Sequence, residues 1–194
     1  MRKKVAKEEI IEKGLEIMLL KGYEGTGIQE IAESVNILKG SFYNYFSSKE
    51  DFTNALINSY AEKSLNFSTS VLTDQSFTPI ERIKKLFVSY WQMLTSKNGY
   101  SGGCFLGNCS QEIGNTNEIL SKSVDKAFKE NVDLLCICLG EAYREKQISN
   151  SHDFMTLAEF VLLSWQGVLV RTKSAKSEIA FESFMKLMFE KVLV

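Results

Sequence analysis

Residues 38–50, LKGSFYNYFSSKE, combine polar side chains with aromatic rings in a pattern that suggests a binding surface. Phe42 and Phe46 stand at positions i and i+4, so on a helix both point to one side and anchor it. The remaining hydroxyl, amide and ammonium groups are then forced outward, and such groups contact phosphate oxygens and base edges in a major groove. They belong to Lys39, Ser41, Tyr43, Asn44 and Tyr45. The simpler alternative is that the two tyrosines only cover the core with amphipathic rings.

Side chains suited to catalysis or metal binding are sparse. The chain has one histidine, His152, whereas metal-dependent chemistry in a helical bundle generally needs two beside its carboxylates. No Glu-x-x-His motif occurs, and the cysteines show no CxxC spacing. They are Cys104, Cys109, Cys136 and Cys138. In a cytosolic chain such cysteines are reduced thiols rather than a disulfide framework. A catalytic helical bundle is therefore the weaker hypothesis, and we expect no enzyme, no metal site and no cofactor.

The overall composition is that of a globular chain with a core. Its 194 residues are 44% hydrophobic, and the formal net charge is −1, so any basic surface for nucleic acid must be local. This length fits one domain of ordinary size, or a small module fused to a larger one. The longest apolar run, residues 160–170, falls short of the roughly 18 residues of a membrane span. Acidic residues follow the Met-Arg-Lys-Lys start, unlike a signal peptide. We expect a cytoplasmic protein.

Apolar residues recur at helical spacing along the whole chain, which contains a single proline, Pro79. Lys21-Gly22 is typical of the end of a first helix. Capping boxes at residues 26–29, 47–50 and 78–81 predict three helix starts. Together with the glycine-rich break at residues 98–103, these signals predict an all-α fold of about nine helices.

Two short helices near residues 26–34 and 39–46 are joined by a tight turn, which predicts a helix-turn-helix. Ala32 is small where the two helices cross. Asn36 can adopt the left-handed conformation that such a turn requires. With the helix that ends at Gly22, this unit has three helices.

The N-terminal part of the chain resembles the DNA-binding domain of TetR-family transcriptional regulators. The matching segments, in order and spacing, are Lys21-Gly22-Tyr23, Thr26, Ile31-Ala32, Lys39-Gly40-Ser41-Phe42-Tyr43, Tyr45-Phe46 and Ser48-Lys49-Glu50-Asp51. The resemblance implies that Thr26 caps the second helix near a phosphate. It implies that Lys39, Ser41 and Asn44 face bases. It also implies that Tyr43, Tyr45 and Lys49 grip the DNA backbone on either side.

Some positions depart from the pattern that this family usually shows. Leu38 stands where a capping Ser or Thr is usual, and Asn36 replaces the usual turn glycine. Asn44 and Tyr45 replace commoner residues, so the operator sequence of other members does not transfer. Gly14 stands where Ala is usual, which costs up to about 1 kcal/mol in helix propensity.

The resemblance also divides the chain, with a helix-turn-helix DNA-binding domain at residues 1–47 and a ligand-binding and dimerisation domain at residues 48–194. Segments 102–108, GGCFLGN, and 164–171, SWQGVLVR, resemble a subgroup that includes electrophile and reactive-chlorine sensors. Residues expected to line an effector site are Trp91, Cys104, Phe105, Asn108, Cys109, Trp165 and Gln166. For any single aromatic residue among them, a plain core position is the stronger alternative.

The last two helices, about His152–Lys173 and Ser177–Val192, are apolar on more than one face. Either they lie centrally within one chain, or two helices from each subunit form a four-helix interface. We expect the second, and with it a homodimeric repressor on a near-palindromic double-stranded DNA operator, released by a small-molecule or thiol-reactive effector. The alternative is a dimeric small-molecule-binding protein that has lost DNA binding.

Cys104 is the cysteine with the strongest case for a reactive thiol. Gly102 and Gly103 break the chain before it, so we expect it in the first turn of a short helix. There the helix dipole stabilises the thiolate, the species that oxidants and electrophiles attack. The alternative is that Cys104 is a small buried apolar residue, as free cysteines usually are. Cys109 is the next candidate, and Cys136 and Cys138 are expected to be structural.

Overall fold

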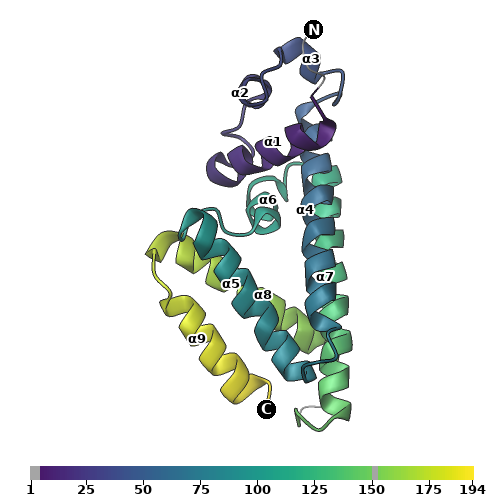
Figure 1. The fold of residues 1–194 in the computed structure, drawn as a ribbon, viewed down its shortest axis with the longest axis vertical. Helices are drawn as coiled ribbons and strands as arrows, with labels where there is room; N and C mark the ends of the chain where they lie inside the picture. The colour runs from purple at the N-terminus through teal and green to yellow at the C-terminus, as the bar shows by residue number, and fades with distance from the viewer. Residues whose placement is uncertain (1–4, 150–152) are drawn as a thin grey trace. The chain divides into compact units, whose positions relative to one another are not determined.

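The computed structural model describes residues 5–149 and 153–194, and within these ranges it contains helices and no strand. The helices are α1 (Lys7–Lys21), α2 (Ile28–Ser34), α3 (Lys39–Phe42), α4 (Lys49–Leu72), α5 (Pro79–Asn98), α6 (Phe105–Ile113), α7 (Glu118–Arg144), α8 (Phe154–Ala175), α9 (Ile179–Leu187) and the π-helical turn η1 (Met188–Val192) (Figure 1). The predicted all-α class is confirmed. His152, the predicted start of the penultimate helix, lies outside the described residues.

The chain folds into two compact units. Unit 1 comprises residues 1–62 and 104–127, and unit 2 comprises residues 63–103 and 128–194. The long helices α4 and α7 each contribute their first part to unit 1 and the rest to unit 2. The predicted functional boundary between residues 47 and 48 falls just before α4, and it stays a prediction.

Three phenylalanine rings form the centre of unit 1. Phe42 and Phe46 are buried, as their spacing predicts, and both pack against Phe52 of α4. The ring centroids lie 5.3 Å apart for Phe42 and Phe46, 5.2 Å for Phe42 and Phe52, and 4.9 Å for Phe46 and Phe52. Centroids at 4.5–7 Å with tilted or edge-on rings are the favourable arrangement for aromatic pairs. We call these residues the phenylalanine triad.

Gly14 of α1 lies directly on the phenylalanine triad. A Cβ atom at this position would stand 2.2 Å from Cζ of Phe52, well inside van der Waals contact. Phe52 is fully buried and its ring packs on those of Phe42 and Phe46, so it cannot move aside without displacing them. The glycine therefore lets α1 approach the triad, and its low helix propensity is offset by this packing.

The ends of the first helices confirm one predicted signal and correct two. Gly22 ends α1 with a positive φ of 77°, as predicted. The capping box at residues 26–29 is wrong, because α2 starts after Gly27 and the Thr26 hydroxyl donates instead to the Gly22 carbonyl at 2.7 Å. The box at residues 47–50 is displaced by one residue, since α4 starts at Lys49: Ser48 Oγ accepts from the Asp51 N–H at 3.0 Å.

The turn between α2 and α3 has the conformation that the sequence predicts. Asn36 adopts φ 56°, in the left-handed region. The Ile37 N–H donates to the Ala32 carbonyl at 3.0 Å, and the Ala32 side chain is fully buried at the crossing. The helix that follows is shorter than the predicted range of residues 39–46. α3 ends at Phe42, and the chain continues as turns to Tyr45.

Aromatic residues of α5, α8 and α9 form the core of unit 2. The ring of Trp91 on α5 stacks on Phe181 of α9 with centroids 4.4 Å apart and an angle of 1° between the planes. Phe87 of α5 packs on Trp165 of α8 at 5.2 Å and on Phe184 of α9 at 5.0 Å. These pairs hold the three helices together within the unit.

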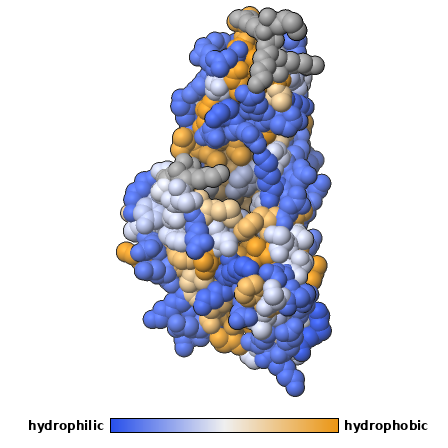
Figure 2. Space-filling model, in the orientation of Figure 1, coloured by the Kyte–Doolittle hydropathy of each residue, from blue (hydrophilic) through white to orange (hydrophobic). Residues whose placement is uncertain are grey.

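The sides of α8 and α9 away from this core carry exposed apolar side chains. Phe160 is 49% exposed and Leu163 is 61% exposed on α8, and Ile179 and Leu187 on α9 are 67% and 57% exposed. In the region that α9 occupies in Figure 1, Figure 2 shows apolar residues exposed among hydrophilic ones. In the described part of the chain, α8 alone is long and apolar enough to cross a membrane by length and composition, a test that the core helix of a soluble protein also passes.

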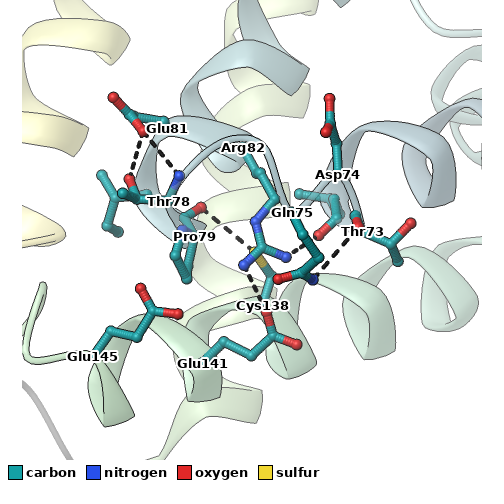
Figure 3. A network of polar contacts seen from close by, with 12 residues as sticks. Thr73, Asp74, Gln75, Thr78, Pro79, Glu81, Arg82, Cys138, Glu141 and Glu145 are labelled. Carbon is teal, nitrogen blue, oxygen red and sulfur yellow. Dashed lines mark hydrogen bonds and ion pairs between the residues drawn. The ribbon is translucent and has the colours of Figure 1, made fainter.

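A buried arginine connects three helices of unit 2 (Figure 3). The Arg82 side chain on α5 is 1% exposed, and its Nη1 donates to the carbonyl of Leu72, the last residue of α4, at 2.6 Å. Its Nη2 pairs with Glu141 of α7 at 2.7 Å. The carbonyls at a helix C-terminus lack partners within the helix, so Arg82 caps α4. The predicted capping box at Thr78 and Glu81 starts α5 in the same region: Glu81 Oε2 accepts from the Thr78 N–H at 2.9 Å.

The contact between Gly14 and the phenylalanine triad yields a prediction of stability. Gly14→Ala should lower the free energy of unfolding by about 1–3 kcal/mol, because overpacking exceeds the gain in helix propensity. Gly40→Ala is the matched control: nothing lies within 4 Å of an added Cβ there, so the same change inside α3 should be neutral or stabilising. Urea unfolding of both variants measures the difference, and a stabilised Gly14→Ala protein would contradict this packing.

Candidate nucleic-acid interface and effector residues

The predicted reading residues divide by exposure along the segment around α3. Lys39, Tyr43 and Asn44 are exposed, while Ser41 and Tyr45 are half-buried. Phe42 and Phe46 are buried between them. The segment therefore presents a polar outer face above the phenylalanine triad. Leu38, the residue before α3, is exposed and its side chain makes no cap, as the departure from the family pattern predicts.

Tyr45 has a structural contact that the sequence does not reveal. Its hydroxyl donates to the Val5 carbonyl at 2.9 Å. The ring is half-buried, and this bond ties the segment before α1 to the end of the reading segment. The oxygen of Tyr45 keeps acceptor capacity only, so its predicted contact with a phosphate requires the hydroxyl to turn away from Val5.

Lys49 and Thr26, predicted to contact the backbone of DNA, are both linked to the turn between α1 and α2. Nζ of Lys49, at the start of α4, lies 4.3 Å from the centroid of the Tyr23 ring, a cation–π contact. Burial, followed by the charges of Glu24 and Glu50, raises the pKa of Tyr23, so the ring stays neutral beneath the lysine. Thr26 is buried and bonded to Gly22.

The predicted effector residues fall into two sets. Cys104, Phe105, Asn108 and Cys109 belong to α6 and its N-cap in unit 1, and Phe105 is buried against the Tyr60 ring with centroids 5.6 Å apart. Trp91, Trp165 and Gln166 belong to unit 2. Both tryptophans pack in the aromatic core, whereas Gln166 is half-buried. Their joint role as an effector site stays a prediction.

The four thiols have different surroundings. Cys104 is half-buried and is the N-cap of α6, one residue before the predicted first turn. Burial raises the pKa of Cys109 to about 12 and that of Cys138 to about 11. Cys138 also donates to the Pro79 carbonyl at 3.5 Å. Cys136, next but one on the same helix, is half-buried, and partial burial raises its pKa as well.

Comparison with known proteins identifies the family. Residues 10–56 match the profile of bacterial regulatory proteins of the tetR family, and residues 79–188 match that of a tetracyclin repressor-like C-terminal domain. The chain belongs to the TetR family. It is therefore a transcriptional regulator with an N-terminal helix-turn-helix domain, as the motifs in its first fifty-one residues predict.

Individual members of the TetR family align along most of the chain. The HTH-type transcriptional repressor DhaR of Mycobacterium sp. strain GP1 is 28% identical over 100% of this chain and 95% of its own length. The crystal structure of a regulatory protein TetR from Rhodobacter sphaeroides has a TM-score of 0.91 at 28% identity, covering 98% of this chain and 100% of that one. The reduced form of E. coli NemR has a TM-score of 0.82 at 25% identity, with 92% of each chain covered.

Thiol reactivity should follow the burial of the four cysteines. At pH 8 a thiol with a pKa of about 12 has roughly one thiolate in ten thousand molecules, so Cys109 should resist iodoacetamide in the native protein. Cys138 should resist for the same reason, whereas Cys104, at the N-terminus of α6, should react faster than Cys136, which lies inside α7. Peptide mapping after timed labelling measures the order. Labelling in urea is the control, since all four should then react alike.

Equal labelling of native Cys104 and Cys136 would contradict the predicted order. Rapid native labelling of Cys109 would contradict the burial on which its raised pKa depends.

Proposed function

We propose that the protein is a dimeric transcriptional repressor that binds a near-palindromic operator and is released by an effector. The observation that carries the proposal is the polar face of residues 38–45 above the phenylalanine triad, which presents an ammonium, a hydroxyl and an amide on a short helix and the turn after it. These are the groups that read base edges and contact phosphates. The family and the name of the repressor DhaR support the direction of control. We place the protein in the cytoplasm with its operator.

Within this proposal the reading residues have distinct roles. Lys39, Ser41 and Asn44 contact bases from α3 and the turn after it. Tyr43, Tyr45 and Lys49 contact phosphates on either side, and Thr26 contributes from within, because its hydroxyl ties the turn before α2 to Gly22. Because α3 has only four residues, the base contacts come from its single turn and from the adjoining loop.

The proposed dimer forms through α8 and α9. Their exposed apolar side chains are large and close in sequence, a composition that favours an interface over a solvated face. Two helices from each subunit form a four-helix interface with twofold symmetry. That symmetry places two reading helices roughly 34–36 Å apart, which matches successive major grooves of a palindrome.

The effector is a small molecule or a thiol-reactive compound. A thiol-reactive compound acts on Cys104. Cys104 is the N-cap of a helix that ends in unit 1, the unit that also holds the helix-turn-helix. Its half-buried sulfur leaves room for an oxidant or electrophile, unlike that of Cys109. Similarity to NemR, whose structure is described as a reduced form, supports a thiol-based response.

Operator binding gives the first test. Among genomic fragments selected for binding, Lys39→Ala and Asn44→Ala should each cost about 1–3 kcal/mol of affinity through lost base contacts. Lys49→Ala should instead weaken binding on all sequences and lower the salt slope by about one unit. Lys84→Ala, an exposed lysine on α5, is the control and should change neither quantity. Fluorescence anisotropy at several salt concentrations measures both.

Unchanged affinity in the Lys39 and Asn44 variants would contradict the assigned reading face. Absence of any bound fragment for the wild-type protein would favour the alternative, a dimeric small-molecule-binding protein without DNA binding.

Replacing an exposed apolar residue by a charge tests the dimer. Leu163→Arg should dissociate it, with a loss of about 3 kcal/mol or more, because the interface would bury an uncompensated charge. Ile137→Arg on α7 is the matched control, since both wild-type side chains are 61% exposed. Sedimentation velocity reports the oligomeric state. Dissociation by the α7 variant, with the α8 variant still dimeric, would place the interface elsewhere.

A further inference from the structure

A carboxylate of α6 holds the backbone of the turn between α1 and α2. Oε2 of Glu112 accepts a hydrogen bond from the Tyr23 N–H at 2.6 Å. The two residues are 89 positions apart in the chain, and both belong to unit 1. Bonds from a backbone N–H to a charged acceptor are shorter and stronger than neutral ones. This contact therefore connects α6 with the first residues after α1.

Gly22 lets the carboxylate approach this closely. A Cβ atom at position 22 would stand 2.5 Å and 2.6 Å from the two carboxylate oxygens of Glu112. The same glycine has φ 77°, which side-chain-bearing residues rarely adopt. The end of α1 is thus shaped both for a tight turn and for the Glu112 side chain.

The turn that Glu112 holds carries Thr26 and contacts Lys49, a proposed phosphate contact at the start of α4. The hydroxyl of Thr26 donates to the Gly22 carbonyl at 2.7 Å, and the Thr26 N–H donates to the Tyr23 carbonyl at 3.3 Å. Nζ of Lys49 lies 4.3 Å from the centroid of the Tyr23 ring, so Lys49 contacts the turn through this ring. The positions of Thr26 and Lys49 therefore depend on where Tyr23 is held.

The segment from α6 into α7 also contacts the start of α4. Nδ2 of Asn117, one residue before α7, donates to the carboxylate of Glu50, and Ser123 Oγ donates to Oδ1 of Asn54 at 2.7 Å. These bonds fix the first turns of α4 against the same segment that carries Glu112. The α1–α2 turn and the start of α4 are thus both held by the segment that runs from α6 into α7.

We propose that Glu112 is a positioning residue for operator binding: it sets the place of the α1–α2 turn and, through Tyr23, of Thr26 and Lys49. A displacement of α6 is then passed to the phosphate contacts by one hydrogen bond. This inference rests on the proposed function only where it concerns affinity for DNA. The hydrogen bond from the Tyr23 N–H to Glu112 is a property of unit 1 that can be measured without DNA.

Three variants separate the contact from general stability. Glu112→Ala removes the acceptor, and Glu112→Gln keeps an oxygen that can accept from the Tyr23 N–H. Gln111→Ala, on the neighbouring residue of the same helix, is the control, since Gln111 and Glu112 are both exposed. Hydrogen exchange of the Tyr23 amide, resolved by NMR, is measured on free protein. Affinity and salt slope are measured on a genomic fragment that wild-type protein binds.

Glu112→Ala should exchange the Tyr23 amide on the order of tenfold faster and bind operator on the order of tenfold more weakly. Its salt slope should fall by up to about one unit, because the Lys49 ammonium loses the Tyr23 ring that holds it toward the phosphate, whereas a loss of folded protein alone would leave the slope unchanged. Glu112→Gln should stay close to wild type in exchange and affinity, and Gln111→Ala should match wild type.

Unchanged exchange at Tyr23 in Glu112→Ala would overturn the hold on the turn. Faster exchange with unchanged operator affinity and salt slope would overturn the positioning role, while leaving the proposed repressor function intact. Absence of any wild-type complex with selected DNA would overturn the proposed function and with it this role, although the exchange data would still decide whether Glu112 holds the turn.

Discussion

The phenylalanine triad restricts how residues 38–52 can be arranged. Phe42, Phe46 and Phe52 share one buried space, and with Gly14 directly above the last of them this space cannot be enlarged without separating α1 from α4. Each ring that is buried fixes the direction of its neighbours, because successive residues of a helix or turn point different ways. The polar outer face is therefore a consequence of packing beneath it, and the chemistry of the surface is set by the core.

Unit 2 is held together in a different way, by stacked aromatic rings and by one buried charge. Removing the partner of a buried charge leaves that charge uncompensated, so loss of Glu141, itself partly exposed, would be costly for the buried Arg82. The guanidinium also caps α4 through the Leu72 carbonyl, which fixes the end of the helix whose beginning lies in unit 1. α4 is thus anchored at its start by Asn117 and Ser123 and at its end by Arg82, so it is constrained separately within each unit.

Local patterns predicted most of the fold, and contacts between distant residues account for what they missed. The i, i+4 spacing of Phe42 and Phe46, the turn at Asn36 and the stop at Gly22 depend on neighbours in the chain, and all three are present. The capping box at Thr26 fails, because its hydroxyl has a better partner in the preceding turn.

Gly14 and Glu112 show the limit of a single sequence most clearly. Helix propensity alone makes Gly14 a weakness, and only the position of Phe52, far along the chain, shows that the space is filled. Glu112 resembles any other charged residue on an amphipathic helix until its partner 89 residues away is known. The proposed DNA-contacting residues follow from the local pattern, whereas Glu112, the proposed positioning residue, does not.

The short helix α6 carries Glu112 near one end and Cys104 at the other. The chain passes from unit 2 into unit 1 after Gly102 and Gly103, both with positive φ, and α6 follows at once with Cys104 as its N-cap. A nine-residue helix is about 13 Å long, and four of its side chains are buried, so it is anchored along its whole length. Cys104 and Glu112 lie near its opposite ends. In the proposed thiol response, a chemical change at Cys104 acts on one end of the helix whose other end holds the α1–α2 turn through Glu112.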